Sequence, residues 1–241
     1  MMRAGIPLLV AVMLAAGVAA PAAQEAVVEE DFTSLEHWEP LEFPKIDRHT
    51  EYTIAASEEA EAGGSVLEAV SGSSASGLVF ESTFDTSETP VLEWRWKIEH
   101  TIPGGNALSK EGDDYAARIY VIFPYDPEEV SFAEKLKYKT ARLLYGEYPP
   151  LASLNYIWAN REHEEAFLPS VYSSRSMMFV MEEGDAHSGT WRTYRVNIRE
   201  DYRRAFGEEA PNQASLALMS DTDNTGSEAT AYFDYIRLLA E

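Results

Sequence analysis

The chain has 241 residues, no cysteine and a formal net charge of −22 at pH 7. This excess of negative charge argues against a binder of nucleic acid or of anionic membranes, because both need Lys and Arg to neutralise phosphate. Without cysteine no disulfide can hold the fold. A chain of this length nevertheless buries enough apolar surface to be stable through its core alone.

The first 22 residues have the pattern of a secretory signal peptide. Arg3 precedes a short run over residues 6–20 that is rich in Leu, Val and Ala. This run is shorter than the roughly 20 apolar residues that a transmembrane helix needs. Small residues then match an A-x-A cleavage pattern after Ala22, as in signal peptides. We therefore expect cleavage of residues 1–22, no membrane span afterwards, and an exported (periplasmic or secreted) single domain over residues 23–241. An uncleaved N-terminal anchor is the alternative.

Short strand-like segments follow, separated by turns rich in Gly, Ser, Pro or acidic residues. The expected strands span residues 52–56, 65–70, 77–84, 91–98, 114–123, 153–159, 176–181, 191–198, 214–219 and 229–238. Many short strands of this kind are typical of a β-sandwich.

Two helices are expected among these strands. Asp126 and Pro127 fit the cap and first position of a helix, and apolar residues at helical spacing predict an amphipathic helix over residues 128–145. A shorter helix over residues 200–206 ends before Gly207, a residue that commonly terminates helices. We find no repeat and no second domain boundary. The predicted fold is therefore all-β: an antiparallel β-sandwich of jelly-roll type with one inserted amphipathic helix and a short second helix.

Two of the expected strands alternate aromatic, apolar and charged residues. One reads Leu92-Glu93-Trp94-Arg95-Trp96-Lys97-Ile98, and the other contains Asp114-Tyr115-Ala116-Ala117-Arg118-Ile119-Tyr120. Successive side chains of a strand point to opposite faces. The first strand therefore places its two Trp residues in the core. The second places Tyr115 and Ala117 on one face and Asp114, Ala116, Arg118 and Tyr120 on the other.

A sheet face that carries aromatic residues among charges of both signs suits sugar recognition. The candidate ligand-binding residues are Arg95, Lys97, Asp114, Arg118, Tyr120, Asn155 and Trp158. Tyr120 and Trp158 would stack on sugar rings, while the others would bond hydroxyls or a uronic acid, whose carboxylate suits the planar fork of Arg. Cross-strand ion pairs that only stabilise the sheet are the alternative for Asp114 and Arg118.

The segment Ser220-Asp221-Thr222-Asp223-Asn224-Thr225-Gly226 offers a candidate metal site. Asp221, Asp223 and Asn224 supply hard oxygens of the type that Ca²⁺ prefers, so Ca²⁺ is a candidate cofactor. The same residue types also form hairpin turns for conformational reasons alone. A different arrangement, in which the first and last strands adjoin, would bring Glu30 or Asp31 near Asp234.

Four segments together resemble a family of exported bacterial proteins that is catalogued only as a domain of unknown function. They are Trp94-Arg95-Trp96-Lys97, Gly112-Asp113-Asp114-Tyr115-Ala116-Ala117-Arg118, Leu154-Asn155-Tyr156-Ile157-Trp158-Ala159-Asn160 and the segment over residues 220–226. The resemblance covers nearly the whole chain after residue 22 and implies a shared fold, without an activity. The two ends, around Phe32 and Trp38 and over residues 232–238, also resemble jelly-roll carbohydrate-binding modules, more loosely.

These patterns predict an exported protein that binds a poly- or oligosaccharide through a sheet face lined by Arg, Lys, Asp and Tyr. One alternative is a polysaccharide-degrading enzyme that uses the same groove. A lyase would use Arg95 or Arg118 to neutralise a uronate and Tyr120 or a histidine as base. A hydrolase would pair Asp114 with Asp221 or Asp223. Another alternative is a non-catalytic structural or interaction domain with a protein partner. The sequence contains no G-x-S-x-G, H-E-x-x-H or glycine-rich phosphate loop.

Overall fold

The computed structural model describes residues 26–125 and 150–240. Within these residues, fourteen strands form two sheets. The strands of the first sheet are β1 (Ala26–Glu30), β3 (Glu51–Ala56), β4 (Ser65–Gly72), β7 (Val91–Ile98), β12 (Arg192–Asn197) and β14 (Glu228–Leu239). Those of the second sheet are β2 (Trp38–Glu42), β5 (Ala75–Phe80), β6 (Phe84–Asp85), β8 (Tyr115–Phe123), β9 (Ala152–Ala159), β10 (Phe167–Ser170), β11 (Ser173–Glu183) and β13 (Gln213–Asp221).

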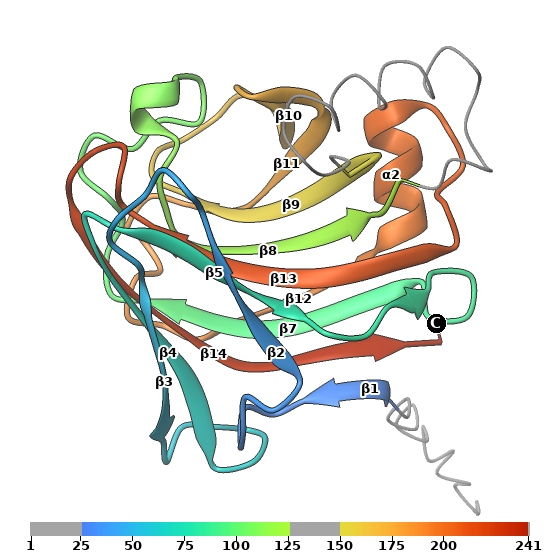
Figure 1. Cartoon of the computed structure of the whole chain (residues 1–241), viewed down its shortest axis with the longest axis horizontal. Coiled ribbons are helices and arrows are strands. Elements are labelled where there is room, and N and C mark those ends of the chain that lie inside the picture. The colour runs from blue at the N-terminus through green and yellow to red at the C-terminus, as the bar shows by residue number, and fades with distance from the viewer. Residues whose placement is uncertain (1–25, 126–149, 241) are drawn as a thin grey trace, which may run out of the picture.

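The two sheets pack face to face as a β-sandwich (Figure 1), so the predicted fold class is confirmed. The first sheet has the order β12-β7-β14-β4-β3, with β1 beside β14. The second has the order β10-β11-β9-β8-β13-β5-β2, with β6 beside β13. All pairings between the described strands are antiparallel except that of β9 with β11, which is parallel. The connections from β4 to β5, β7 to β8, β12 to β13 and β13 to β14 each pass from one sheet to the other.

Aromatic side chains from both sheets fill the space between them. The rings of Trp94 and Tyr156 lie 5.2 Å apart, and those of Trp96 and Trp158 lie 6.3 Å apart. All four side chains are fully buried. Large buried aromatic groups contribute strongly to core stability. The predicted core position of Trp94 and Trp96 is therefore confirmed, and Arg95 and Lys97, which alternate with them, lie on the outer face of the first sheet.

The alternation predicted for residues 114–123 fails at the start of β8. Arg118 is opposite Met219 and Tyr115 is opposite Asp221, so two residues of β8 face one residue of β13. Such a β-bulge shifts the residues on one side of it to the other face. Consequently the Tyr115 ring lies on the same face as Arg118, whose guanidinium carbon is 5.0 Å from the ring centroid. Ala116 packs in the core. The prediction for both residues was wrong.

Helix α2 (Ile198–Phe206) confirms the predicted short helix. The Asn197 side chain accepts a hydrogen bond from the backbone of Glu200, and Gly207 has a left-handed conformation with φ of 70°, as expected for an N-cap and a helix-terminating glycine. The helix lies at one end of the sandwich (Figure 1), and Tyr156 donates a hydrogen bond of 3.1 Å to Asp201. The predicted helix over residues 128–145 lies outside the described residues.

Most predicted strands are present, with differences at their ends. The predicted strand over residues 77–84 is divided into β5 and β6, and β10 was not predicted. Within the described residues, no helix is both long and apolar enough to cross a membrane.

Candidate functional site

The seven candidate ligand-binding residues lie in three different places. Arg95 and Lys97 are on the outer face of the first sheet, whereas Asp114, Arg118, Tyr120 and Asn155 belong to the second sheet or its edge. The reason is topological, since β7 and β8 follow each other in the chain but lie in different sheets. The expectation that these residues share one face was wrong.

Trp158 lies in the third place, inside the sandwich. Its side chain is 1% exposed, packs against Trp96 and donates a hydrogen bond of 3.0 Å to the backbone oxygen of Gly184. On β9, Trp158 and Tyr156 point into the core, while Asn155 and Ile157 point outward. The predicted role of Trp158 in stacking on a sugar is therefore corrected to core packing.

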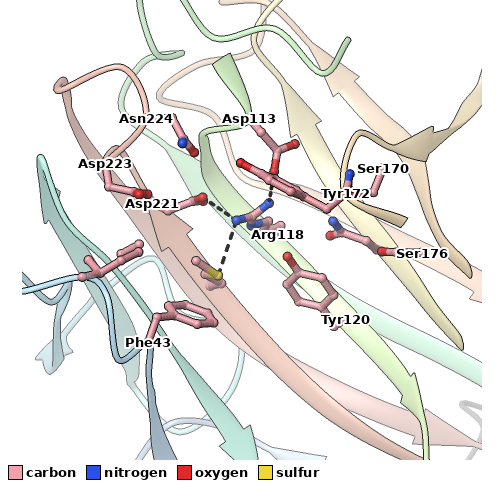
Figure 2. Close-up of a pocket in the computed structure, with 14 residues that line it drawn as sticks. Phe43, Asp113, Arg118, Tyr120, Ser170, Tyr172, Ser176, Asp221, Asp223 and Asn224 are labelled. Atoms are coloured by element: carbon pink, nitrogen blue, oxygen red, sulfur yellow. Dashed lines mark hydrogen bonds and ion pairs between the residues drawn. The ribbon is translucent and has the colours of Figure 1, made fainter. Parts of the chain in front are cut away.

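A cavity of about 330 Å³ opens on the outer face of the second sheet (Figure 2). Its floor is formed by side chains from three adjacent strands: Arg118, Tyr120, Asn155, Met219 and Asp221. Its rim comes from loops on opposite sides, with Phe43 and Ile46 after β2 and Ser170 and Tyr172 at the turn between β10 and β11. A smaller apolar hollow of about 200 Å³ shares Phe43, Tyr120 and Met219 with it and continues along β8 and β13.

Arg118 occupies the centre of the cavity floor. Figure 2 shows its guanidinium group between Asp221 and Asp113. It forms an ion pair with Asp221 and lies 3.7 Å from Asp113. Burial alone would lower the pKa of Arg118, but the negative charges around it, chiefly that of Asp221, outweigh burial and raise it. The two terminal nitrogens of the guanidinium are thus engaged by protein carboxylates, so they cannot form the paired hydrogen bonds that a uronate would need.

Three carboxyl groups of the cavity are poorly solvated. Burial raises the pKa of Asp113, Asp221 and Asp223 above the usual value. For Asp221 and Asp113 the attraction of Arg118 opposes this effect. Asp223 is half-buried, and the negative charge of Asp114 raises its pKa further.

Asp114 lies behind this group and holds the turn between β13 and β14. Its two carboxylate oxygens accept hydrogen bonds of 3.1 Å and 2.7 Å from the backbone amides of Asn224 and Thr225. It is fully buried and is not part of the cavity lining. A hydrolase that used Asp114 as one of its two carboxylates would lack contact between this residue and the substrate.

The structure brings two of the three predicted metal ligands together. Carboxylate oxygens of Asp114, Asp221 and Asp223 lie within 4.8 Å of one another, which could accommodate a cation. Ca²⁺ takes six to eight oxygen ligands, whereas both oxygens of Asp114 bond backbone amides and Asp221 pairs with Arg118. The positive charge of Arg118 beside Asp221 would repel a calcium ion, so the fit to calcium is poor. Asn224 lines the cavity beside the cluster.

Two buried polar atoms of the floor lack hydrogen-bond partners in the part of the chain that is described: Nε of Arg118 and Oδ1 of Asn155. These residues are only 5% and 2% exposed. Asn155 also hydrogen-bonds the hydroxyl of Tyr120, and burial raises the pKa of Tyr120 to about 12. Tyr120 is therefore protonated at neutral pH and unsuited to act as the base of a lyase. One donor and one acceptor are left for a ligand.

The outer face of the first sheet holds Arg95 and Lys97 in a separate network. Arg95 forms an ion pair with Asp234, which is fully buried, and Lys97 contacts Glu59 at 2.9 Å. Both cations lie over the ring of Trp191, at 4.5 Å and 4.7 Å from its centroid. These charges are satisfied within the protein, which favours a stabilising role over ligand binding.

The alternative metal arrangement at the chain ends is not formed. β1 lies beside β14 as expected. However, the carboxylate of Asp234 also accepts hydrogen bonds of 2.9 Å and 3.4 Å from the backbone amides of Glu61 and Ala62. Glu30 accepts a hydrogen bond of 3.2 Å from Trp38. Each carboxylate therefore has its own donors within the protein.

Several cavity residues were missed in the sequence. Asp113 immediately precedes Asp114, which we predicted as a ligand-binding residue. The alternation of side chains along the strand did not indicate that Asp113, and not Asp114, lines the cavity. Phe43 and Tyr172 lie in loops outside any predicted strand, and Tyr172 is 57% exposed. Aromatic residues beside turn signals were the only local indication of a binding rim.

Replacing Asp223 with Asn should raise stability at neutral pH. The pKa of Asp223 is higher in the folded than in the unfolded state. The contribution of this carboxyl group to stability is therefore fully present below its unfolded pKa, and it is lost as the pH rises through its folded pKa. At pH 7 the charged Asp223 therefore destabilises the fold, by less than about 1 kcal/mol after allowance for solvent screening. We expect Asp223→Asn to melt higher than wild type at pH 7 and equally near pH 3.5. A lower melting temperature at pH 7 would contradict this account.

The fold and the cavity define a β-sandwich protein with a polar cavity on the outer face of one sheet. By its sequence the chain belongs to the family described as protein of unknown function (DUF3047), whose model matches residues 36–237. The resemblance noted from the sequence motifs is thereby confirmed. A search of the curated proteins found no match.

Several solved structures are similar in fold. One is the family 11 carbohydrate-binding module of a cellulosomal cellulase of Clostridium thermocellum, with 10% identity, a TM-score of 0.43, and coverage of 92% of this chain and 97% of that one. The family 30 module of another C. thermocellum cellulase has 11% identity, a TM-score of 0.40 and coverage of 78% and 86%. Lectin I-B4 from Griffonia simplicifolia has 10% identity, a TM-score of 0.42 and coverage of 87% and 98%.

Proposed function

We propose that this protein binds an oligosaccharide, or the end of a polysaccharide, in the cavity on the outer face of the second sheet. The observation that carries the proposal is a pair of buried atoms, Nε of Arg118 and Oδ1 of Asn155, that have no hydrogen-bond partner among the residues described. A buried polar group without a partner costs about 1–3 kcal/mol. A sugar hydroxyl both donates and accepts hydrogen bonds, so neighbouring hydroxyls of one ring can satisfy the two atoms together.

The size and shape of the cavity support the same proposal. Its volume of about 330 Å³ falls within the range of about 300–1,000 Å³ that is usual for small-molecule sites. Tyr120 and Phe43 contribute aromatic surface to both the cavity and the apolar hollow beside it. A sugar ring has polar edges and apolar faces, so a second ring in the hollow would extend the contact along β8 and β13.

The charges of the cavity favour a glycan without carboxylates over an acidic one. The uronate-binding roles considered for Arg95 and Arg118 lose support, because Arg95 pairs with Asp234 and Arg118 with Asp221. Binding without turnover is accordingly preferred to lyase or hydrolase chemistry. We also propose that the protein acts outside the cytoplasm, on the basis of the signal-peptide pattern over residues 1–22.

The test is calorimetric titration of the mature protein with neutral oligosaccharides, beginning with cello-, xylo- and chito-oligomers. We expect Asn155→Leu to weaken binding by about tenfold or more, because one or more hydrogen bonds to the ligand are lost. Lys97→Gln, on the first sheet, is the matched control and should bind like wild type. Equal binding by wild type and Asn155→Leu would place the ligand elsewhere. Release of shortened or unsaturated products would identify an enzyme instead.

A further inference from the structure

The cavity has more negative than positive charge, and this excess bears on which glycan it accepts. Among the described residues, three carboxylates, of Asp113, Asp221 and Asp223, line it together with one cationic side chain, Arg118. Three negative charges against one positive charge leave an excess of two at the described lining. The Nζ atom of the neighbouring Lys110 lies over the Tyr172 ring, 5.3 Å from its centroid, and Lys110 does not line the cavity.

Arg118 does not compensate the three carboxylates equally. It pairs with Asp221 and approaches Asp113 to 3.7 Å, and Asp113 also accepts a hydrogen bond of 3.2 Å from the hydroxyl of Tyr115. Asp223 forms no ion pair within residues 26–125 and 150–240. Its carboxylate nevertheless lies within 4.8 Å of those of Asp114 and Asp221. Among the described residues, therefore, no cation contacts Asp223, and Arg118 attracts it only from beyond ion-pair distance.

An independent observation supports a ligand site in this same cavity. Oδ1 of Asn155, an acceptor, and Nε of Arg118, a donor, both lack partners among the described residues although their side chains are more than nine-tenths buried. A bare metal ion would accept no hydrogen bond from Nε of Arg118, and an acidic sugar would be repelled by the three carboxylates. A ligand that carries both an ammonium group and hydroxyl groups meets every requirement, because an ammonium donates three hydrogen bonds and accepts none.

We propose that the cavity selects a sugar with a free, protonated amino group, which binds Asp223 through its ammonium while its hydroxyls bond Asn155 and Arg118. This inference rests on the proposed glycan-binding function and narrows its substrate class. N-acetylation of the same sugar removes the charge, and so does replacement of the amine by a hydroxyl. The ratio of the affinities for the free amine and for its uncharged analogues therefore measures how much Asp223 contributes to binding.

The experiment compares β-1,4-linked glucosamine, N-acetylglucosamine and glucose oligomers of equal length by calorimetric titration at pH 6 and low salt. Wild type should bind the glucosamine oligomer about tenfold or more tightly than the other two, as expected for a charge-assisted hydrogen bond. Asp223→Asn should abolish this preference and retain the weaker affinity for the uncharged oligomers. Glu58→Gln, an exposed site on the loop between β3 and β4, removes the same charge away from the cavity and should keep the preference.

The other outcomes are distinguishable. Equal affinity of wild type for the three oligomers would overturn the selection of an amine and leave glycan binding intact. A preference for the amine that persists in Asp223→Asn would also overturn the inference, because it would arise from the net charge of the protein. Binding of CaCl₂ alone that is lost in Asp223→Asn, with no oligomer bound by wild type, would make the cluster a metal site and overturn both proposals.

Discussion

Replacing Arg118 with Met should lower the free energy of unfolding by about 3–5 kcal/mol, the effect expected when one partner of a buried ion pair is removed. The substitution would leave Asp221 and Asp113 buried without their counter-charge. Met retains much of the side-chain volume, so the loss would come mainly from charge and not from an empty space. The measurement is urea unfolding of both proteins at pH 7.

The double variant Arg118→Met/Asp221→Asn tests the cause of this loss. It removes both charges of the closest pair, so it should be clearly more stable than Arg118→Met alone. The destabilisation by Arg118→Met should also diminish towards acidic pH. Burial raises the pKa of Asp221 and Asp113 even with Arg118 present, and these groups become protonated as pH falls through their pKa values. A loss of stability that does not change with pH or with the second substitution would show that packing, and not charge, dominates.

Replacing Trp158 with Ala should lower the free energy of unfolding by a similar amount, about 3–5 kcal/mol, because it opens a cavity in a tightly packed core. Trp158 contacts Trp96 across the sandwich and hydrogen-bonds the backbone of Gly184. Trp158→Phe should be less damaging, since it keeps an aromatic ring and loses mainly the indole hydrogen bond. Urea unfolding at pH 7 provides the comparison.

A matched surface variant distinguishes a core role for Trp158 from a ligand-binding role. Tyr172→Ala at the exposed rim should change stability by less than about 0.5 kcal/mol and should weaken ligand binding. Trp158→Phe should have the reverse effect, with reduced stability and unchanged affinity. Unchanged stability of Trp158→Ala together with lost glycan binding would contradict the core position of this residue.

The cavity contains a carboxylate that pairs with a cation, Asp221, and one that forms no ion pair with the described residues, Asp223. The two carboxylates have different consequences for stability. Arg118 with Asp221 forms a buried pair whose separation would be costly, while Asp223 destabilises the protein in its charged form. A group that reduces stability and lines a cavity is a common compromise at binding sites. Asp223→Asn should therefore stabilise the fold and impair recognition of an amino sugar.

The sequence by itself determined the features that depend on neighbouring residues. Period-2 alternation identified the core side of β7, where Trp94 and Trp96 alternate with charged residues, and located most strands to within a few residues. Helix α2 was recognisable from the residues at its end, above all Gly207. The motifs of the chain also placed it in its family, and numerous short strands separated by turns predicted the sandwich.

Only the tertiary structure decided how these elements meet. Local alternation cannot reveal that β7 and β8 belong to different sheets, because strand order is set by contacts between residues far apart in the chain. Local alternation also cannot predict the β-bulge at the start of β8, where one extra residue places the Tyr115 ring on the same face as Arg118. The binding cavity arises from such non-local pairings, which bring Asp221 from the end of the chain to Arg118 near its middle. The sequence identified several of these side chains as candidates. Whether they line one cavity depended on the register of β8 against β13.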